Sequence, residues 1–209
     1  MIELFNNLLQ FLVTLLATIG AGILFYKNRV QAYLLLTCFF GTFMLGTLYW
    51  TLHFFLFNYT PQIFYVSEFA WNASYMFLLT IEYTLSTPDE RKFRHPAVWL
   101  VPIFCIPQLI LYLLRGDILS NLLICGLTMA VAWHSTRGLV YARRQSGKLR
   151  AMQFFHIAVL RIIILEYCLW TSSCFWISDT YTNPYFWIDF LLTASLFALL
   201  PATKKAVSA

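Results

Sequence analysis

The residues of this chain best suited to chemistry are two acids that lie inside long apolar segments. Glu68 and Asp189 occupy matching positions in two similar stretches, and each is followed one helical turn later by a polar residue, Asn72 and Thr193 respectively. Residues four apart share a helix face, so each acid and its neighbour would point the same way. Two carboxylates that come close do not both stay ionised without a counter-charge. The four residues predict a proton- or cation-coupled site, or a pocket for an amine. The structural alternative is that each acid only hydrogen-bonds a neighbouring helix and fixes its packing.

Further ionisable residues lie within apolar segments, where each is costly and needs an explanation. At about 1.5 Å of rise per residue, Glu166 and His53 fall at a depth similar to that of the two acids above. This predicts one acid-rich polar layer, although packing is the preferred interpretation of His53. Glu82 and Arg161 fall together nearer the other end and predict an ion pair. Such a pair either locks the helices in one arrangement or opens as a gate.

The segments that hold these residues are long enough to cross a bilayer. Apolar residues make up 60% of the 209 residues and charged residues 11%, against about 25% charged in soluble domains. A membrane helix needs about 20 apolar residues. The sequence therefore predicts an all-α integral membrane protein, a single domain over residues 1–209. Its seven transmembrane helices are expected at Leu4–Tyr26, Ala32–Phe57, Ile63–Ser86, Ala97–Leu114, Ile118–Tyr141, Ala151–Trp176 and Tyr185–Ala202.

The chain also contains an internal similarity. Residues 64–79 align without gaps with residues 185–200, and shorter matches upstream keep the same order. This predicts a duplicated three-helix unit, residues 1–86 and 118–202, joined by a linker helix at 97–114. Transporters often bind their solute between such repeats, near the middle of the membrane. The alternative is that apolar sequences built from few residue types align by chance.

Basic residues gather on one side of the predicted topology. Twelve of the 14 lysines and arginines fall in or beside the loops after the first, third and fifth spans and in the C-terminal tail. Only Arg115 falls on the opposite side, and Arg161 lies within a span. Because cytoplasmic loops are enriched in Lys and Arg, this distribution predicts an outside N-terminus and an inside C-terminus. The net charge of +5 then reflects topology and contact with anionic lipid, and we expect no nucleic acid partner.

Motifs of catalysis and cofactor binding are missing from the sequence. There is no HExxH, no GxSxG and no Gly-rich phosphate loop. The four histidines fall at several depths, and the five cysteines lie within spans without a CxxC pair. Those cysteines are interpreted as small packing residues. We expect neither an enzyme nor a bound metal or cofactor.

The order of three, one and three helices resembles that of the sugar-efflux and PQ-loop transporters, and more loosely that of microbial rhodopsins. In the first group, polar residues on helices three and seven help to line the substrate site, so the resemblance implies that role for Asn72 and Thr193. The chain departs from the family motif because its Pro61-Gln62 and Pro107-Gln108 pairs are not on helices one and five. It also has no lysine near Asp189 that could hold a retinal. The resemblance covers topology alone, which is a weak guide to function.

Two functions agree with these features. The preferred one is a small transporter of a polar or cationic solute, with its site in the acid-rich layer. Its expected partners are the lipid bilayer and a second copy of the chain. The alternative is a seven-helix membrane sensor or accessory subunit that acts through a separate cytoplasmic protein docked on the basic loops. For either function we expect a bacterial cytoplasmic membrane.

Overall fold

The computed structural model describes residues 2–59, 65–116 and 118–208, and all regular structure in these ranges is helical. Seven helices are long and two are short. Their bounds are α1 Ile2–Asn28, α2 Gln31–Phe57, α3 Tyr65–Leu85, α4 Pro88–Lys92, the 3₁₀ helix η1 Pro96–Trp99, α5 Leu100–Leu113, α6 Ile118–Arg143, α7 Gly147–Ser173 and α8 Pro184–Ser208.

Local sequence explains where several helices begin and end. Arg29 adopts a left-handed conformation with φ of 55°, so the chain turns within two residues and α2 packs back against α1. Asn58 ends α2 in the same conformation, which asparagine tolerates well. Thr87 caps α4 by accepting a hydrogen bond from the Glu90 backbone N–H at 3.2 Å. Short connections of this kind place successive helices side by side.

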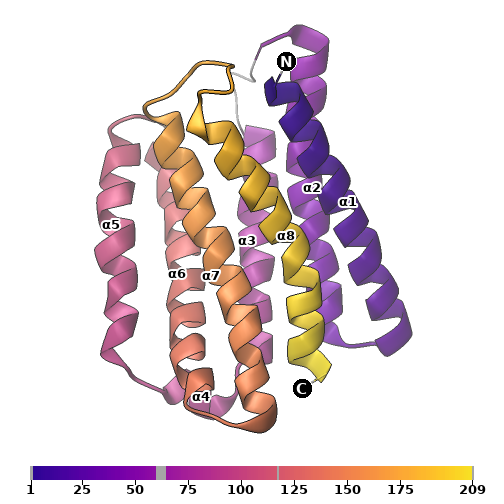
Figure 1. Cartoon of the computed structure of the whole chain (residues 1–209), viewed down its shortest axis with the longest axis vertical. Helices are drawn as coiled ribbons and strands as arrows, with labels where there is room; N and C mark the ends of the chain where they lie inside the picture. The colour runs from indigo at the N-terminus through magenta and orange to yellow at the C-terminus, as the bar shows by residue number, and fades with distance from the viewer. Residues whose placement is uncertain (1, 60–64, 117, 209) are drawn as a thin grey trace.

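Six of the long helices form a closed ring. Along the ring, α1 packs on α2, α2 on α3, α3 on α6, α6 on α7, α7 on α8, and α8 on α1. Helices α1, α3, α6 and α8 run in one direction, and α2, α5 and α7 run back (Figure 1). The turn between α1 and α2, the helix α4, the turn between α6 and α7 and the end of α8 all lie at one end of the bundle (Figure 1). We call this end, which carries most of the basic residues, the basic end.

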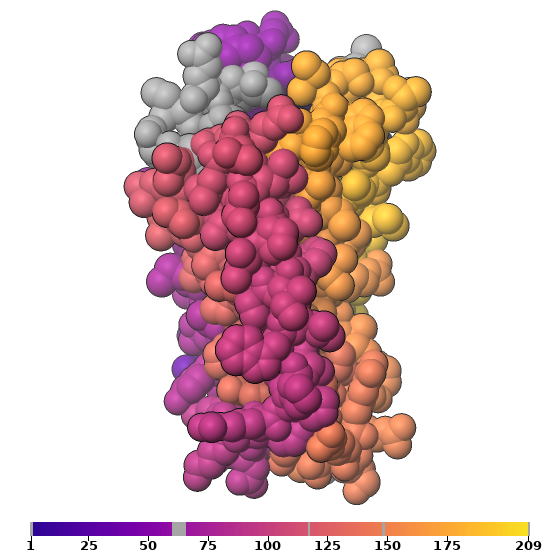
Figure 2. All heavy atoms as spheres, turned by 90° about the vertical axis from the view of Figure 1, so that its left-hand side faces the viewer, coloured from indigo at the N-terminus to yellow at the C-terminus, as the bar shows by residue number. Residues whose placement is uncertain are grey.

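Helix α5 lies outside the ring. It packs on α6 and α7 and runs along one face of the molecule (Figure 2). The hydroxyl of Tyr112 donates to the backbone oxygen of Tyr167 at 2.9 Å, and Thr171 donates to Gln108 at 2.8 Å. Large apolar side chains on the other side of α5 are exposed, including Ile103 at 68%.

The distribution of polarity is the reverse of that in a soluble protein. Serine, threonine and acidic side chains are buried between the helices, whereas leucine, isoleucine and phenylalanine side chains are exposed around the outside. Exposed apolar surface of this extent requires an apolar surrounding. Within the described ranges, six helical segments are long and apolar enough to cross a membrane, namely α1, α2, η1 with α5, α6, α7 and α8. The prediction of an all-helical integral membrane protein is confirmed at this level.

Helix α3 is the seventh long helix and is not among those six. It carries Glu68, Asn72 and Glu82, which lower its hydropathy. Its predicted span began at Ile63, which lies outside the described residues. The count of seven membrane crossings therefore stays a prediction.

Candidate functional site

A buried carboxylate joins the first and last helices of the ring. Asp189 of α8 is 3% exposed and accepts two hydrogen bonds from α1, from Asn6 Nδ2 at 2.6 Å and from Gln10 Nε2 at 2.7 Å. The side-chain oxygen Oε1 of Gln10 accepts in turn from the Thr47 hydroxyl of α2 at 3.2 Å. The Asp189 carboxylate thus holds the ring closed at this point.

A second buried acid lies close by. Glu166 of α7 is 5% exposed and accepts a hydrogen bond from the hydroxyl of Tyr75 of α3 at 2.6 Å. It is near enough to Asp189 for the two carboxylates to interact electrostatically. We call the group formed by Asn6, Gln10, Thr47, Tyr75, Glu166, Asp189 and Thr193 the Asp189 layer.

Several buried polar atoms around this layer have no hydrogen-bond partner among the described residues. Buried polar atoms in folded proteins nearly always have a partner, in the protein or in water. An excess of unsatisfied donors and acceptors favours a region that takes up water or a polar ligand. The atoms are Asn6 Oδ1, Asn7 Nδ2, Ser67 Oγ, Trp71 Nε1, Asn72 Oδ1 and Thr193 Oγ1.

Of the residues predicted at the solute site, three lie in the Asp189 layer and two lie on α3. Asp189, Glu166 and Thr193 lie in the Asp189 layer, with Thr193 one turn from Asp189 on α8. Glu68 is half-buried in the first turn of α3, and the hydrogen bonds to Asp189 come from α1 rather than from α3. Asn72 is half-buried on the same helix.

His53 lies apart from these residues. It sits near the end of α2, where its ring packs on Phe57 and Tyr59 and its Nδ1 is 3.2 Å from the Tyr59 backbone oxygen. This position agrees with the packing interpretation.

A second polar cluster lies toward the basic end. His156 of α7 is fully buried, with Nδ1 3.2 Å from Glu82 Oε2 of α3 and Nε2 3.7 Å from Glu90 Oε1 of α4. The Ser135 hydroxyl of α6 donates to the other oxygen of Glu82. We call Glu82, Glu90, Ser135 and His156 the His156 cluster. The imidazole ring connects α7 with α3 and α4, and the hydrogen bond from Ser135 to Glu82 adds α6.

Glycine and arginine on α6 shape this cluster. A Cβ at Gly138 would overlap the His156 ring and lie 2.6 Å from Glu90 Oε1, so only glycine leaves room for both side chains. Arg137 donates to the Arg91 backbone oxygen at 3.1 Å. Burial raises the pKa of the Glu90 carboxyl; the positive charges of His156 and Arg137 oppose this shift, and the Glu82 carboxylate adds to it.

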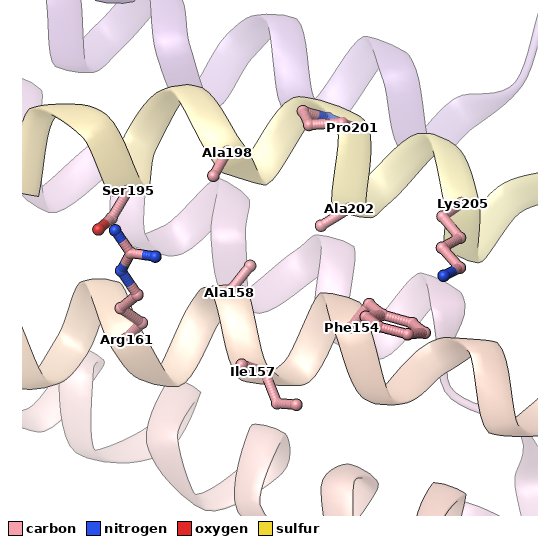
Figure 3. A pocket seen from close by; sticks show the side chains of 9 residues that line it. All are labelled: Phe154, Ile157, Ala158, Arg161, Ser195, Ala198, Pro201, Ala202 and Lys205. Carbon is pink, nitrogen blue, oxygen red and sulfur yellow. The ribbon is translucent and has the colours of Figure 1, made fainter.

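The predicted pair of Glu82 with Arg161 is replaced by another arrangement. Glu82 contacts His156 and Ser135, whereas Arg161 is exposed on the outside of α7. Arg161 lines a hollow of about 310 Å³ between α7 and α8, and its guanidinium points toward Ser195 (Figure 3). Arg161 and His156 are five residues apart, about 140° around the helix. Only one of them can face α3, and the structure gives that place to His156.

Sequence reasoning missed Asn6, Gln10, Tyr75, Glu90, Ser135 and His156. One signal was available on α1, where Asn6, Gln10 and Thr14 repeat every four residues within an otherwise apolar helix. All three are buried, as a polar stripe facing the bundle interior requires. His156 offered a similar signal because it is an ionisable residue inside an apolar segment.

No protein-family model, curated protein or solved structure matches the chain. Within the described ranges, no group of three or more histidine, cysteine or acidic side chains could hold a metal ion. The two polar clusters are therefore interpreted from their own contacts.

Proposed function

We propose that this protein is a transporter of a small polar or cationic solute, with its solute site in the Asp189 layer. The observation that carries the proposal is that each buried acid of the Asp189 layer belongs to one of the helices α6–α8 and accepts hydrogen bonds from one of the helices α1–α3. Asp189 of α8 is bound by α1, and Glu166 of α7 is bound by α3. A site shared in this way changes whenever the two groups move relative to each other, which is how alternating access works.

We further propose that the two groups, α1–α3 and α6–α8, are repeats. Under the alignment, α1 corresponds to α6 and α3 to α8. The packing of α1 on α8 is then the counterpart of the packing of α6 on α3, and both contacts occur. Helix α5 takes the place of the linker outside the ring. With α3 counted as a crossing, the proposal gives seven spans and puts the basic end in the cytoplasm of a bacterium.

The solute class follows from the charge of the site. Two carboxylates and several unsatisfied amide and hydroxyl groups can bind a cation or an amine. A neutral polar solute would use the same hydrogen-bonding atoms, with the acids carrying protons.

The alternative function is a sensor or accessory subunit. It is favoured by the exposed cations at the basic end, among them Arg143, Arg144, Arg150 and Lys204, which offer a surface for an acidic cytoplasmic protein. This function needs a partner, whereas transport needs only the chain or its homo-oligomer.

A ligand screen tests the proposal. Purified protein in detergent would be heated with amines, amino acids, vitamins and sugars at two pH values, because a ligand of the folded state raises the melting temperature. We expect a ligand whose effect is lost in Asp189→Asn and Glu166→Gln. The matched control is Arg161→Gln, which removes a charge from the outside of α7 and should keep the effect. A ligand that stabilises both acid variants as well as wild type would contradict the site. Binding without flux in vesicles would contradict transport and favour the sensor.

A further inference from the structure

The His156 cluster brings two acids to the two nitrogens of one imidazole. Glu82 and Glu90 approach Nδ1 and Nε2 from opposite sides, at 3.2 and 3.7 Å. His156 Nε2 has no hydrogen-bond partner among the described residues, so its contact with Glu90 is electrostatic, and only an imidazolium attracts both carboxylates. The geometry therefore matches the charged form of the ring.

A charge count leads to the same form. Arg137 of α6 interacts electrostatically with Glu90 and with His156. With a neutral imidazole, the two acids and Arg137 leave one uncompensated negative charge, and with the imidazolium the sum is zero. An uncompensated charge in a buried site is costly, so neutrality favours the uptake of one proton.

The other ionisable groups at this end have different contacts. His134 of α6 is bound to Arg137 at 2.8 Å. Arg91 of α4 donates to Ser86 and lies over the Tyr83 ring. Lys205 of α8 lies over the Phe154 ring. The charged groups that act on His156 itself are Glu82, Glu90 and Arg137.

We propose that the His156 cluster is a proton-binding site that takes up one proton and, with it bound, holds the basic end of the bundle closed. The proton comes from water at the basic end and is carried by the His156 ring, whose Nε2 faces Glu90 at ion-pair distance. Glu90, at 3% exposed, is the most accessible member of the cluster, and its neighbour Asp89 in α4 is exposed. Loss of the proton leaves Glu82 and Glu90 as two buried negative charges with only Arg137 to offset them, which favours separation of α3 and α4 from α7.

The use of this proton in transport rests on the function proposed above, but the proton site does not. If the protein is a transporter, proton release at the basic end would accompany the opening of that end. The cluster would then couple the solute movement to a proton gradient.

The experiment measures the unfolding equilibrium of purified protein in detergent between pH 6 and pH 9. The folded state holds a proton that the unfolded chain releases above the ordinary imidazole value of about 6.5. Unfolding must then become more favourable as pH rises, approaching a tenfold change in the equilibrium constant per pH unit. We expect this dependence in wild type and its loss in His156→Gln. Glu90→Gln keeps the side-chain shape and should weaken the pH dependence. If His156→Gln does not fold, Glu90→Gln is the variant that tests the proton site.

Two controls separate the inference from the function proposed above. His53→Gln removes a histidine outside the cluster and should keep the wild-type pH dependence. Asp189→Asn should keep it as well, while it abolishes the effect of a ligand. The proposal is overturned when wild type shows no such dependence, or when His156→Gln or Glu90→Gln retains it in full. Failure of the ligand test alone leaves this result unaffected, because no solute takes part in it.

Discussion

At the scale of single residues, the polar side chains of this bundle divide by whether a partner faces them. Asp189 and Glu82 are both buried and both contact a neighbouring helix through side chains. Arg161, predicted at a depth similar to that of Glu82, is exposed on α7 and lines an open hollow. The energetic consequences of removing each charge should differ accordingly.

Glu82→Gln should destabilise the fold by about 3 kcal/mol, because it leaves His156 without its closest partner in a buried site. Arg161→Gln should change stability by no more than about 0.5 kcal/mol, as is usual for exposed positions. Unfolding in denaturant at fixed detergent concentration would measure both. A reciprocal exchange, Glu82→Arg with Arg161→Glu, should not restore stability, and recovery in that double variant would instead support a direct pair.

The contact between Gln10 and Asp189 can be measured by a double-mutant cycle. Gln10→Ala should cost about 1.5–3 kcal/mol, because a buried carboxylate loses a hydrogen bond. Much of that loss should vanish when Asp189 is already asparagine, which gives a coupling energy of about 1 kcal/mol or more. Asn28→Ala is the control, since the Asn28 amide bonds only to Leu24 of its own helix and is exposed. Additive effects for Gln10 and Asp189 would mean that their contact contributes no stability.

At the scale of helices, the apolar segments predicted most of the elements and few of the contacts. Hydrophobic length located α1, α2 and α6 to within a few residues, because membrane crossing sets the length of a helix. Length does not determine how a helix is rotated about its axis. The predicted pair of Glu82 with Arg161 depended on that rotation, and similar depth did not reveal that His156 is the residue facing Glu82.

The layer of acids shows the same limit. Glu166 and Asp189 could be predicted as buried because they are costly anywhere else in an apolar helix. Their partners Tyr75 and Asn6 could not be found from depth alone, because many residues share a depth. The stripe of Asn6, Gln10 and Thr14 was a usable signal of which face of α1 points inward.

Two glycines of α6 give a matched test of helix packing. Gly138→Ala should destabilise by about 1–3 kcal/mol, because the added methyl group overlaps the His156 ring. Gly126→Ala meets no atom within 4 Å and should stabilise by up to about 1 kcal/mol, because alanine favours the helix. Thermal unfolding of the two variants beside wild type would measure the difference. Equal effects at the two positions would show that the His156 ring is not packed against α6.

At the scale of the whole molecule, the ring α1–α2–α3–α6–α7–α8 places its basic loops at one end. Helix α5, outside the ring, is the one long helix that the structure describes between α3 and α6, so the chain returns along the bundle once before α6 begins. For this reason α6 runs in the same direction as α1 (Figure 1). Orientation in the membrane is thus a property of the complete set of helices.

Reporter fusions in bacteria would test that orientation. Green fluorescent protein fused after α8 should fluoresce, because it folds in the cytoplasm, and alkaline phosphatase at the same place should be inactive. Fusions after α5, beside Arg115, should give the opposite result. The same result at both places would rule out the seven-crossing topology.

The closing contact between α1 and α8 also sets the order of events during synthesis. Asn6 and Asp189 are 183 residues apart in the chain. At about 5–20 residues per second, roughly 10–40 seconds pass between the synthesis of α1 and the arrival of its acidic partner. During that interval the amides of α1 lack the carboxylate that they bind in the finished bundle. A ribosome that stalls before α8 therefore leaves the polar stripe of α1 without the carboxylate that would close the ring.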